Sequence, residues 1–332
     1  MKKLINNVEN VLDDMLAGIV AAHPEYVKKL ENANVLVRAD GPIKGKVALV
    51  SGGGSGHEPL DGGYVGKGML DAAVAGEVFT SPTPDQIYEA IKAVDGGAGV
   101  LLIILNYTGD IMNFEMAKEM AEMDDIKVDT VVVNDDVAVE NSTYTAGRRG
   151  IAGTVFVNKI AGAKAEAGGS LEEVKAATQK AIDNVRSMGM ALSSCIVPSA
   201  GKANFSVGEN EVEIGMGVHG EPGTHREELK TAAEIVDQLF VKILDDMKLE
   251  SGDEVVVLVN GLAATPLLEL YIVNKRVNEI LTEMRVKIHK TFVGEYMTSL
   301  EMAGFSVSIL KLNTELKELF DSPADSPALK IF

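Results

Sequence analysis

One uninterrupted apolar run constrains the fold of this chain more than any other feature: Gly99-Val100-Leu101-Leu102-Ile103-Ile104-Leu105. A strand that is apolar at every position is typical of a parallel sheet covered on both faces, because a sheet with one wet face alternates apolar and polar residues. Helix signals precede the run at 84–94 and follow it at 111–123, and 127–133 is predicted as a further strand. This alternation of strand, loop and helix predicts a doubly wound α/β sheet.

Capping signals delimit the helices of the first half. Thr83-Pro84-Asp85-Gln86 combines an N-cap, a proline at the first helical position and a capping-box glutamine, and predicts a helix to Val94. Ser170-Leu171-Glu172-Glu173 is a second capping box and predicts a helix to about Met188. The other elements predicted in this half are an amphipathic helix over 8–20, a helix over 151–167, and strands over 35–38 and 46–50.

The alternation falters over the glycine-rich segment 201–223 and then resumes. The elements predicted in the second half are strands over 211–216, 254–259, 288–293 and 306–312, and helices over 231–248 and 267–284. A chain of 332 residues fits two domains at roughly 150 residues each. We therefore predict two α/β domains, residues 1–190 and 191–332, each with a mostly parallel or mixed sheet flanked by helices.

Charge and cysteine usage exclude several classes of partner. The chain has 31 basic and 49 acidic residues, a formal net charge of −18, which argues against nucleic acid or an anionic membrane as the main partner. The single cysteine, Cys195, has apolar neighbours and is interpreted as a buried, inert thiol. The N-terminus lacks the order of a signal peptide, and no apolar run approaches about 18 residues. We expect a soluble, cytoplasmic protein.

A glycine-rich segment follows the strand predicted at 46–50. Four of the five residues from Gly52 to Gly56 are glycine, and His57 comes next. Loops that leave the carboxyl ends of strands carry ligands in α/β sheets, and glycine lets backbone N–H groups approach a small ligand closely. A glycine-rich sequence of this kind more often forms a tight turn with a histidine on the surface. A second, similar element, Gly217-Val218-His219-Gly220-Glu221-Pro222-Gly223, favours a binding site instead.

Standard nucleotide and metal signatures do not fit. A dinucleotide fingerprint that starts at Gly54 would need a glycine where Pro59 stands, and neither glycine–lysine pair continues as a P-loop. His219, Glu221 and His225 match no standard zinc spacing. We therefore expect this chain to bind no metal and no cofactor of its own. Asp135-Asp136 is interpreted as a solvated strand end.

Two histidines and one carboxylate remain as candidates for chemistry. Asp110 follows the buried strand, so it should meet the glycine loop at the same rim of the sheet. An Asp beside a His is the usual arrangement for a general base that acts on a hydroxyl. His219 has small neighbours that leave a ring nitrogen open, and a neutral imidazole is a competent nucleophile. A strand-end histidine bonded to backbone is an equally good interpretation of His219 from the residues alone.

Several long motifs, in the same order along nearly the whole chain, resemble the dihydroxyacetone kinase substrate-binding subunit family. These motifs are 52–59 (Gly-Gly-Gly-Ser-Gly-His-Glu-Pro), 79–85 (Phe-Thr-Ser-Pro-Thr-Pro-Asp), 106–110 (Asn-Tyr-Thr-Gly-Asp), 135–139 (Asp-Asp-Val-Ala-Val), 144–150 (Tyr-Thr-Ala-Gly-Arg-Arg-Gly), 217–223 (Gly-Val-His-Gly-Glu-Pro-Gly) and 264–266 (Ala-Thr-Pro). The resemblance implies a phosphotransferase acting on an alcohol group, in which His219 holds the ketose as a covalent hemiaminal. It also implies that His57 and Asp110 hydrogen-bond the substrate and take the proton of its terminal hydroxyl.

The resemblance extends to the pocket wall and to partners. Gly54, Ser55 and Gly56 would line the pocket with backbone, and Leu105 and Ser81 are further wall candidates. The nucleotide, ADP or ATP with Mg, is expected on a separate kinase subunit, recharged from phosphoenolpyruvate through a phosphotransferase-system phosphocarrier. Homodimers are typical of such proteins.

Two departures from the family pattern leave alternatives open. The family motif has lysine at the position of Leu105, and histidine is common at the position of Asp61. Loss of a charge-stabilising donor can cost about 10²-fold in rate or more. Paralogues that bind the ketose act as coactivators of a transcription regulator without phosphorylating it, so that role is one alternative. A kinase subunit for a related short ketose such as erythrulose is another.

Overall fold

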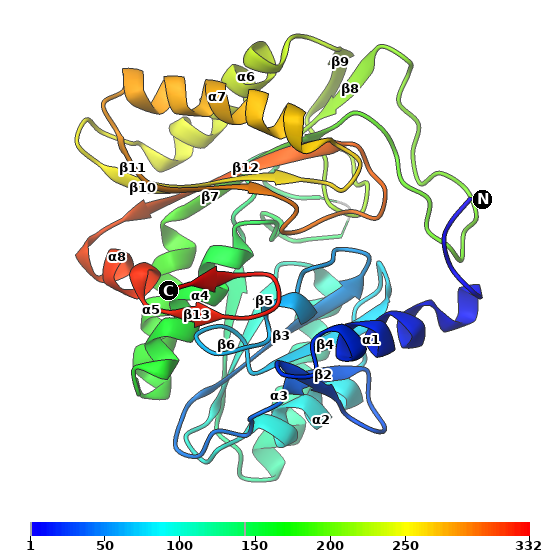
Figure 1. The fold of residues 1–332 in the computed structure, drawn as a ribbon, viewed down its shortest axis with the longest axis vertical. Helices are drawn as coiled ribbons and strands as arrows, with labels where there is room; N and C mark the ends of the chain where they lie inside the picture. The colour runs from blue at the N-terminus through cyan, green and yellow to red at the C-terminus, as the bar shows by residue number, and fades with distance from the viewer. Residues whose placement is uncertain (1, 143) are drawn as a thin grey trace.

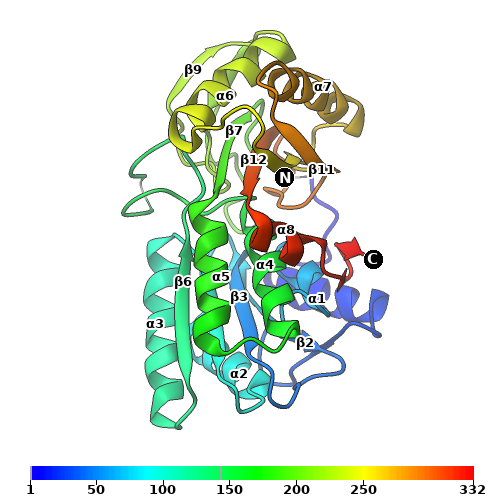
Figure 2. The same cartoon turned by 90° about the vertical axis from the view of Figure 1, so that its left-hand side faces the viewer.

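The computed structural model describes residues 2–142 and 144–332 and contains two mixed six-stranded sheets (Figures 1 and 2). The first sheet has the order β1-β2-β4-β3-β5-β6. Its strands are β1 (Val27–Lys29), β2 (Val35–Arg38), β3 (Ala48–Ser55), β4 (Ala72–Val78), β5 (Val100–Leu105) and β6 (Val128–Val133). β3, β4, β5 and β6 are parallel, whereas β1 and β2 run antiparallel to their neighbours.

The apolar run that sets the fold forms β5, and all six of its residues are buried. Leu102 and Ile104 pack in the core beneath α2 (Pro84–Val94) and α3 (Thr108–Met123). Leu101 and Ile103 pack on the opposite face, in the core that holds α4 (Thr154–Glu166) and α5 (Leu171–Asp183). Burial on both faces explains why this strand has no polar alternation.

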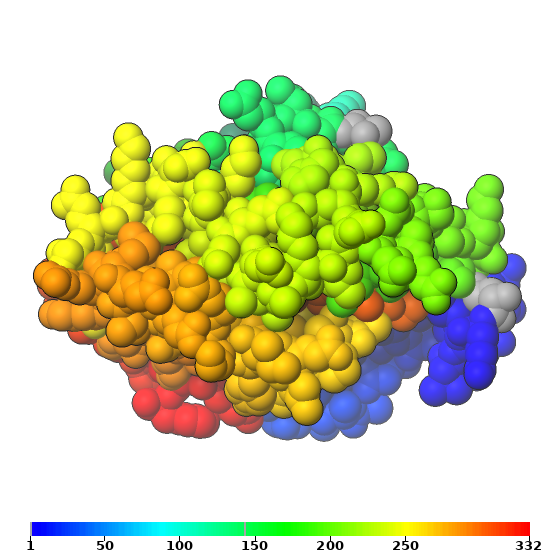
Figure 3. Space-filling model, turned by 90° about the horizontal axis from the view of Figure 1, so that it is seen from above, coloured from blue at the N-terminus to red at the C-terminus, as the bar shows by residue number. Residues whose placement is uncertain are grey.

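The second sheet has the order β11-β10-β12-β7-β8-β9, with β10 and β11 parallel and the other pairs antiparallel. Its strands are β7 (Val185–Ala191), β8 (Glu211–Ile214), β9 (His225–Glu228), β10 (Glu254–Gly261), β11 (Lys287–Gly294) and β12 (Gly304–Leu312). α6 (Ala232–Met247) and α7 (Leu267–Glu283) cover one face and form the surface in Figure 3. The other face packs toward the first sheet through α4, which is buried along almost its whole length. The predicted class of two α/β domains is confirmed.

The ends of the chain close over the first sheet. α1 (Val11–Ala22) is preceded by the short helix η1 (Val8–Asn10), and together they cover the helix predicted over 8–20; His23 is the C-cap of α1. α8 (Thr314–Asp321) and the strands β13 (Ala324–Asp325) and β14 (Lys330–Ile331) bring the C-terminus back beside η2 (Gly62–Tyr64). Among the described residues, no helix combines the length and the apolar composition that crossing a membrane requires.

Three local predictions need correction. The helix predicted to Met188 ends at Asp183, because residues 185–191 pair with β12 and β8 as strand β7. The glycines predicted as a loop continue β3 as far as Ser55. The capping box at Ser170 forms, but none forms at Thr83: its side chain makes no capping bond, and the Gln86 side chain accepts from the Asn34 N–H. The predicted domain boundary between residues 190 and 191 stays a prediction.

Candidate active site

The glycines of β3 are required by close packing against neighbouring backbone. A Cβ on Gly52 would lie 2.3 Å from the Val74 carbonyl oxygen, and one on Gly54 would lie 2.6 Å from the Thr80 nitrogen. Gly56 turns the chain with φ +104°, a conformation that glycine adopts without strain. This turn delivers His57 into the space between the two sheets.

His57 is buried, and its contacts fix which ring nitrogen carries hydrogen. Nδ1 lies 2.8 Å from the Thr298 carbonyl oxygen, which can only accept, so Nδ1 is the donor. The ring stacks on Phe79 with centroids 4.9 Å apart and an interplanar angle of 11°. Burial and the adjacent His219 lower the pKa of His57 to about 3. His57 is therefore neutral near pH 7, with the lone pair of Nε2 directed away from Thr298.

His219 reaches the same point from the second domain. Its Nε2 lies 3.0 Å from Nε2 of His57, and its Nδ1 lies 3.3 Å from a Glu221 carboxylate oxygen. The His219 ring makes edge-on contacts with the rings of Phe79 and Tyr107, and the centroids of His219 and Tyr107 lie 4.8 Å apart. A hydrogen bond between two Nε2 atoms needs one proton, and His57 uses its own on Thr298. The geometry therefore holds a transferable proton between the two rings.

Glu221 orients His219 and balances its charge. The carboxylate accepts from the His219 backbone N–H at 2.8 Å as well as from the ring, and it is almost fully buried. Burial alone would raise the pKa of Glu221, but the hydrogen bond and charge of His219 and the charge of Arg149 lower it to about 2. A permanently ionised carboxylate at Nδ1 keeps a proton there and turns Nε2 toward the pocket.

Asp110 lies in the first turn of α3, at the end of the buried strand β5. Its Oδ1 is buried and has no hydrogen-bond partner within the described part of the chain. Burial raises the pKa of Asp110 to about 6, while the Ser81 hydroxyl and His219 act in the opposite direction. A carboxylate with a raised pKa and a free oxygen can serve as a proton acceptor for a bound hydroxyl.

These groups surround a cavity of about 20 Å³. Its lining residues are Gly52, Gly53, Gly54, His57, Leu60, Asp61, Leu105, Tyr107, Asp110, His219 and Met297. Of the other predicted wall residues, Ser55 donates its hydroxyl to the Gly76 carbonyl oxygen, and the Gly56 N–H donates to Glu58. Ser81 lies beside the first turn of α3, near Gly109. The structure thus brings together His57, His219 and Asp110, and their roles stay predictions.

Other interpretations from the sequence can be compared with the structure. His57 is not a surface residue, and His219 bonds through its ring to side chains rather than to backbone. Asp135-Asp136 is not a solvated strand end. Asp135 accepts from two backbone N–H groups, and Asp136 forms a buried ion pair with Arg149 at 2.6 Å.

Metal ligation and thiol chemistry gain no support from the side-chain positions. His225 is half exposed on β9 and contacts Thr224 and Gln238. Within residues 2–142 and 144–332, no three His, Cys, Asp or Glu side chains are grouped as a metal ion requires. Cys195 is buried, and burial raises its pKa to about 11, as suits an inert thiol.

Three supporting residues were missed in the sequence. Glu221 was weighed only as a metal ligand, although its place two residues after His219 is a signal for an orienting carboxylate. Tyr107 packs against His219, and its buried hydroxyl lacks a hydrogen-bond partner among the described residues. Arg149 stabilises both Glu221 and Asp136 through tertiary contacts, so the 144–150 motif that contains it gives no signal of this role.

Known proteins resemble this chain over most of its length. The Dak1 domain model matches residues 17–328. The chain is 57% identical over 315 residues to the dihydroxyacetone-binding subunit DhaK of PTS-dependent dihydroxyacetone kinase 1 from Listeria innocua, covering 95% of each chain. A crystal structure of the dihydroxyacetone kinase of C. freundii superposes with a TM-score of 0.90 at 34% identity, over 99% of this chain and 60% of that one. A dihydroxyacetone kinase operon co-activator superposes with a TM-score of 0.89 at 33% identity, over 95% and 97%.

Proposed function

The chain belongs to the Dak1 domain family, and from this premise we propose that it binds dihydroxyacetone covalently on His219 and presents it for phosphorylation. The observation that carries the proposal is the 3.0 Å contact between the Nε2 atoms of His219 and His57 in a pocket that also holds Asp110. The relative from Listeria innocua is named a dihydroxyacetone-binding subunit, which supports the same substrate.

The proposed first step is addition of His219 to the ketone. The proton that Nε2 of His219 shares with Nε2 of His57 first passes to His57, which frees the Nε2 lone pair of His219. This lone pair forms a bond to the carbonyl carbon while the carbon–oxygen π bond breaks. The oxygen then takes the proton from Nε2 of His57, which returns to its neutral form. Glu221 stabilises the resulting imidazolium through Nδ1. Glycerol lacks a carbonyl, so this step selects a ketose over the corresponding triol.

The proposed second step uses Asp110 as general base on the terminal hydroxyl. Its pKa of about 6 leaves it ionised above neutral pH, yet basic enough to take the hydroxyl proton as the bond to phosphorus forms. The phosphoryl group would come from a nucleotide with Mg on a separate kinase subunit, itself recharged through a phosphotransferase-system protein. This chain supplies the positioned acceptor.

The cavity volume sets a condition on substrate entry. About 20 Å³ accommodates roughly one water molecule. A three-carbon ketose therefore requires the side chains around the cavity to separate. The insertion of the carbonyl group between the two histidine rings would provide part of this opening.

A homodimer is also proposed, with support from exposed apolar side chains on α7. Leu267, Leu268, Tyr271 and Ile272 are each exposed by half or more, on a helix that forms part of the face in Figure 3. Apolar groups gathered on one helix are typical of an interaction surface. Light scattering should give a dimer for the wild type and a lower mass for Ile272→Glu, whereas Lys92→Glu, at an exposed position of α2 beside the first sheet, serves as the control.

The adduct can be tested with dihydroxyacetone labelled with ¹³C at C2. The proposal expects the carbonyl resonance to be replaced by a tetrahedral carbon on the wild type and on His225→Ala, but not on His219→Ala. Phosphoryl transfer is then measured with a nucleotide-loaded kinase subunit, wild type against Asp110→Asn. A protein-bound tetrahedral carbon, resolved from that of the free ketone hydrate, that persists in His219→Ala would refute attachment at His219.

The alternative is a ketose-binding coactivator without turnover. It is favoured by Leu105, which lies in the pocket wall where the family motif has lysine, and by the similarity to the co-activator structure. In that case the adduct forms, but no donor subunit supports transfer. Leu105→Lys separates the two roles, because a subunit limited only by the missing donor should gain transfer when the lysine is restored.

A further inference from the structure

A larger cavity lies beside the candidate active site and is not explained by the proposed reaction. Its volume is about 510 Å³, within the range of roughly 300–1,000 Å³ typical of small-molecule sites. It shares Gly53, Gly54, Leu60 and Asp61 with the small cavity, but His57, Asp110 and His219 do not line it. The two spaces are therefore neighbours with a common wall.

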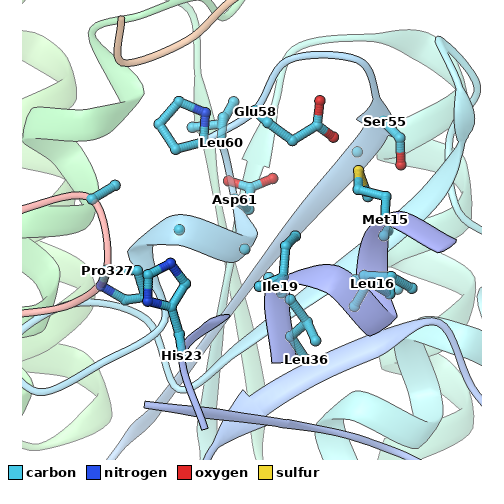
Figure 4. Close-up of a pocket in the computed structure, with 18 of the residues that line it drawn as sticks. Met15, Leu16, Ile19, His23, Leu36, Ser55, Glu58, Leu60, Asp61 and Pro327 are labelled. Atoms are coloured by element: carbon cyan, nitrogen blue, oxygen red, sulfur yellow. The ribbon is translucent and has the colours of Figure 1, made fainter. Parts of the chain in front are cut away.

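Most of the cavity wall is apolar. Met15, Leu16 and Ile19 of α1 form one side together with Leu36 of β2 (Figure 4). This wall suits an apolar molecule, because burial of its surface is favourable by about 25 cal/mol per Å². An apolar cavity of about 150 Å³ is known to bind benzene, so about 510 Å³ has room for a considerably larger body.

The polar groups of the cavity include two carboxylates. Asp61 and Glu58 lie across the cavity from α1 (Figure 4). Glu58 is engaged, because both of its oxygens accept from the Gly56 N–H at 3.1 Å. Asp61 is 8% exposed, and its Oδ1 has no hydrogen-bond partner in the part of the chain that the structure describes. A buried acceptor without a donor costs about 1–3 kcal/mol, so a ligand that supplies the donor is favoured.

We propose that this cavity is a second ligand site, which takes a molecule with an apolar body and a hydrogen-bond-donating head, a hydroxyl or an ammonium, that reaches Asp61. A carboxylate head is disfavoured, because it would face two acidic side chains in a protein of net charge −18. The ligand would use Asp61 and the apolar wall, and none of His57, Asp110 and His219 lines this cavity.

Calorimetry on the full-length protein at pH 8 tests the site with three six-carbon probes: hexan-1-ol, hexylamine and hexanoate. We expect saturable binding of one equivalent of hexan-1-ol and of hexylamine, and at least tenfold weaker binding of hexanoate. Ile19→Trp, which fills the cavity from a partly exposed position, should weaken both ligands at least tenfold. Met116→Trp, on the exposed side of α3, is the matched control and should bind as the wild type does.

Asp61→Asn provides a test that does not depend on filling the cavity. It keeps the volume and an acceptor oxygen but removes the charge, so hexylamine should bind at least tenfold more weakly, while hexan-1-ol stays within threefold of wild type. Absence of saturable binding of either ligand would overturn the proposal. So would equal binding of hexanoate, or binding that neither Ile19→Trp nor Asp61→Asn changes, which would indicate attachment elsewhere on the protein.

Discussion

Glu221→Gln removes one charge and almost no volume from the group that orients His219. The carboxylate accepts from both the backbone N–H and Nδ1 of His219, at 2.8 and 3.3 Å. A glutamine has one acceptor oxygen, so it can replace only one of these bonds. The space is tight, because a Cβ on Gly217 would lie 2.1 Å from the carboxylate, and a glutamine cannot move away. We therefore expect His219 to lose its fixed orientation and its counter-charge.

The size of the effect follows from the pKa of Glu221. A fall from 4.5 to about 2 corresponds to roughly 3 kcal/mol at about 1.4 kcal/mol per pKa unit. His219 and Arg149 share this stabilisation, and one hydrogen bond to a charged group contributes about 1.5–3 kcal/mol. The constant for adduct formation with dihydroxyacetone should therefore fall by about 10- to 100-fold, since about 1.4 kcal/mol is a factor of ten.

The assay is titration with dihydroxyacetone labelled at C2, in which the tetrahedral carbon is integrated at each concentration. Glu227→Gln is the matched control, because Glu227 faces His225 in the same domain at 3.7 Å, outside the pocket. The pH dependence gives a second measurement. The pKa of Glu221 is lowered in the folded protein, so its contribution to stability is complete above about pH 4.5 and is lost as the pH falls toward 2. An adduct constant within threefold of wild type would refute the reasoning.

Three further predictions concern Asp110, Gly54 and Arg149. Burial raises the pKa of Asp110 from 3.8 to about 6, so the ionised group destabilises the fold increasingly from about pH 4 to 6. Asp110→Asn should therefore raise the free energy of unfolding at pH 8 by about 3 kcal/mol while abolishing transfer, and equal stability at pH 8 would contradict this. Gly54→Ala should cost about 1–3 kcal/mol in denaturant unfolding, because its Cβ would meet the Thr80 nitrogen at 2.6 Å, whereas Gly53→Ala meets no atom within 4 Å. Arg149→Met should cost about 3–5 kcal/mol, because it leaves Asp136 buried without its partner, and a loss below 1 kcal/mol would contradict that role.

The sequence predicts those parts of the fold that depend on local patterns. The wholly apolar run at 99–105 places β5 in the centre of a parallel region, and the capping box at Ser170 locates the start of α5. The C-terminal limit of that helix is wrong, because residues 185–191 carry enough apolar side chains to suit either state. Residues 185–191 form a strand because they pair with β12. Since β12 lies more than a hundred residues away, the local sequence does not indicate this pairing.

The candidate site likewise has features that local sequence predicts and features that depend on tertiary contacts. Position after a strand was enough to bring His57 and Asp110 to one rim, because the carboxyl ends of parallel strands meet there. The hydrogen bond that fixes the tautomer of His57 is accepted by the Thr298 carbonyl oxygen, 241 residues along the chain. The burial of Asp136 likewise depends on Arg149 and on folding of the second domain over it. Tertiary contacts, rather than residue type, determine these charges and donors.

The segment 298–300 forms backbone hydrogen bonds with the turn at residues 56–58 of the first domain, as a neighbouring β-strand would. Thr298 donates its N–H to the His57 carbonyl oxygen at 3.1 Å and its hydroxyl to that of Glu58 at 2.8 Å, while Leu300 donates to Gly56 at 2.7 Å. The second half of the chain thus carries His219 together with the backbone that orients His57 and supports the glycine turn of the first half. A chimaera in which one half of the chain is replaced by that of a relative would keep both imidazoles. The site would still form only if the contacts between residues 298–300 and 56–58 were preserved. The relative placement of the two imidazoles is a property of the junction, and neither half of the chain sets it alone.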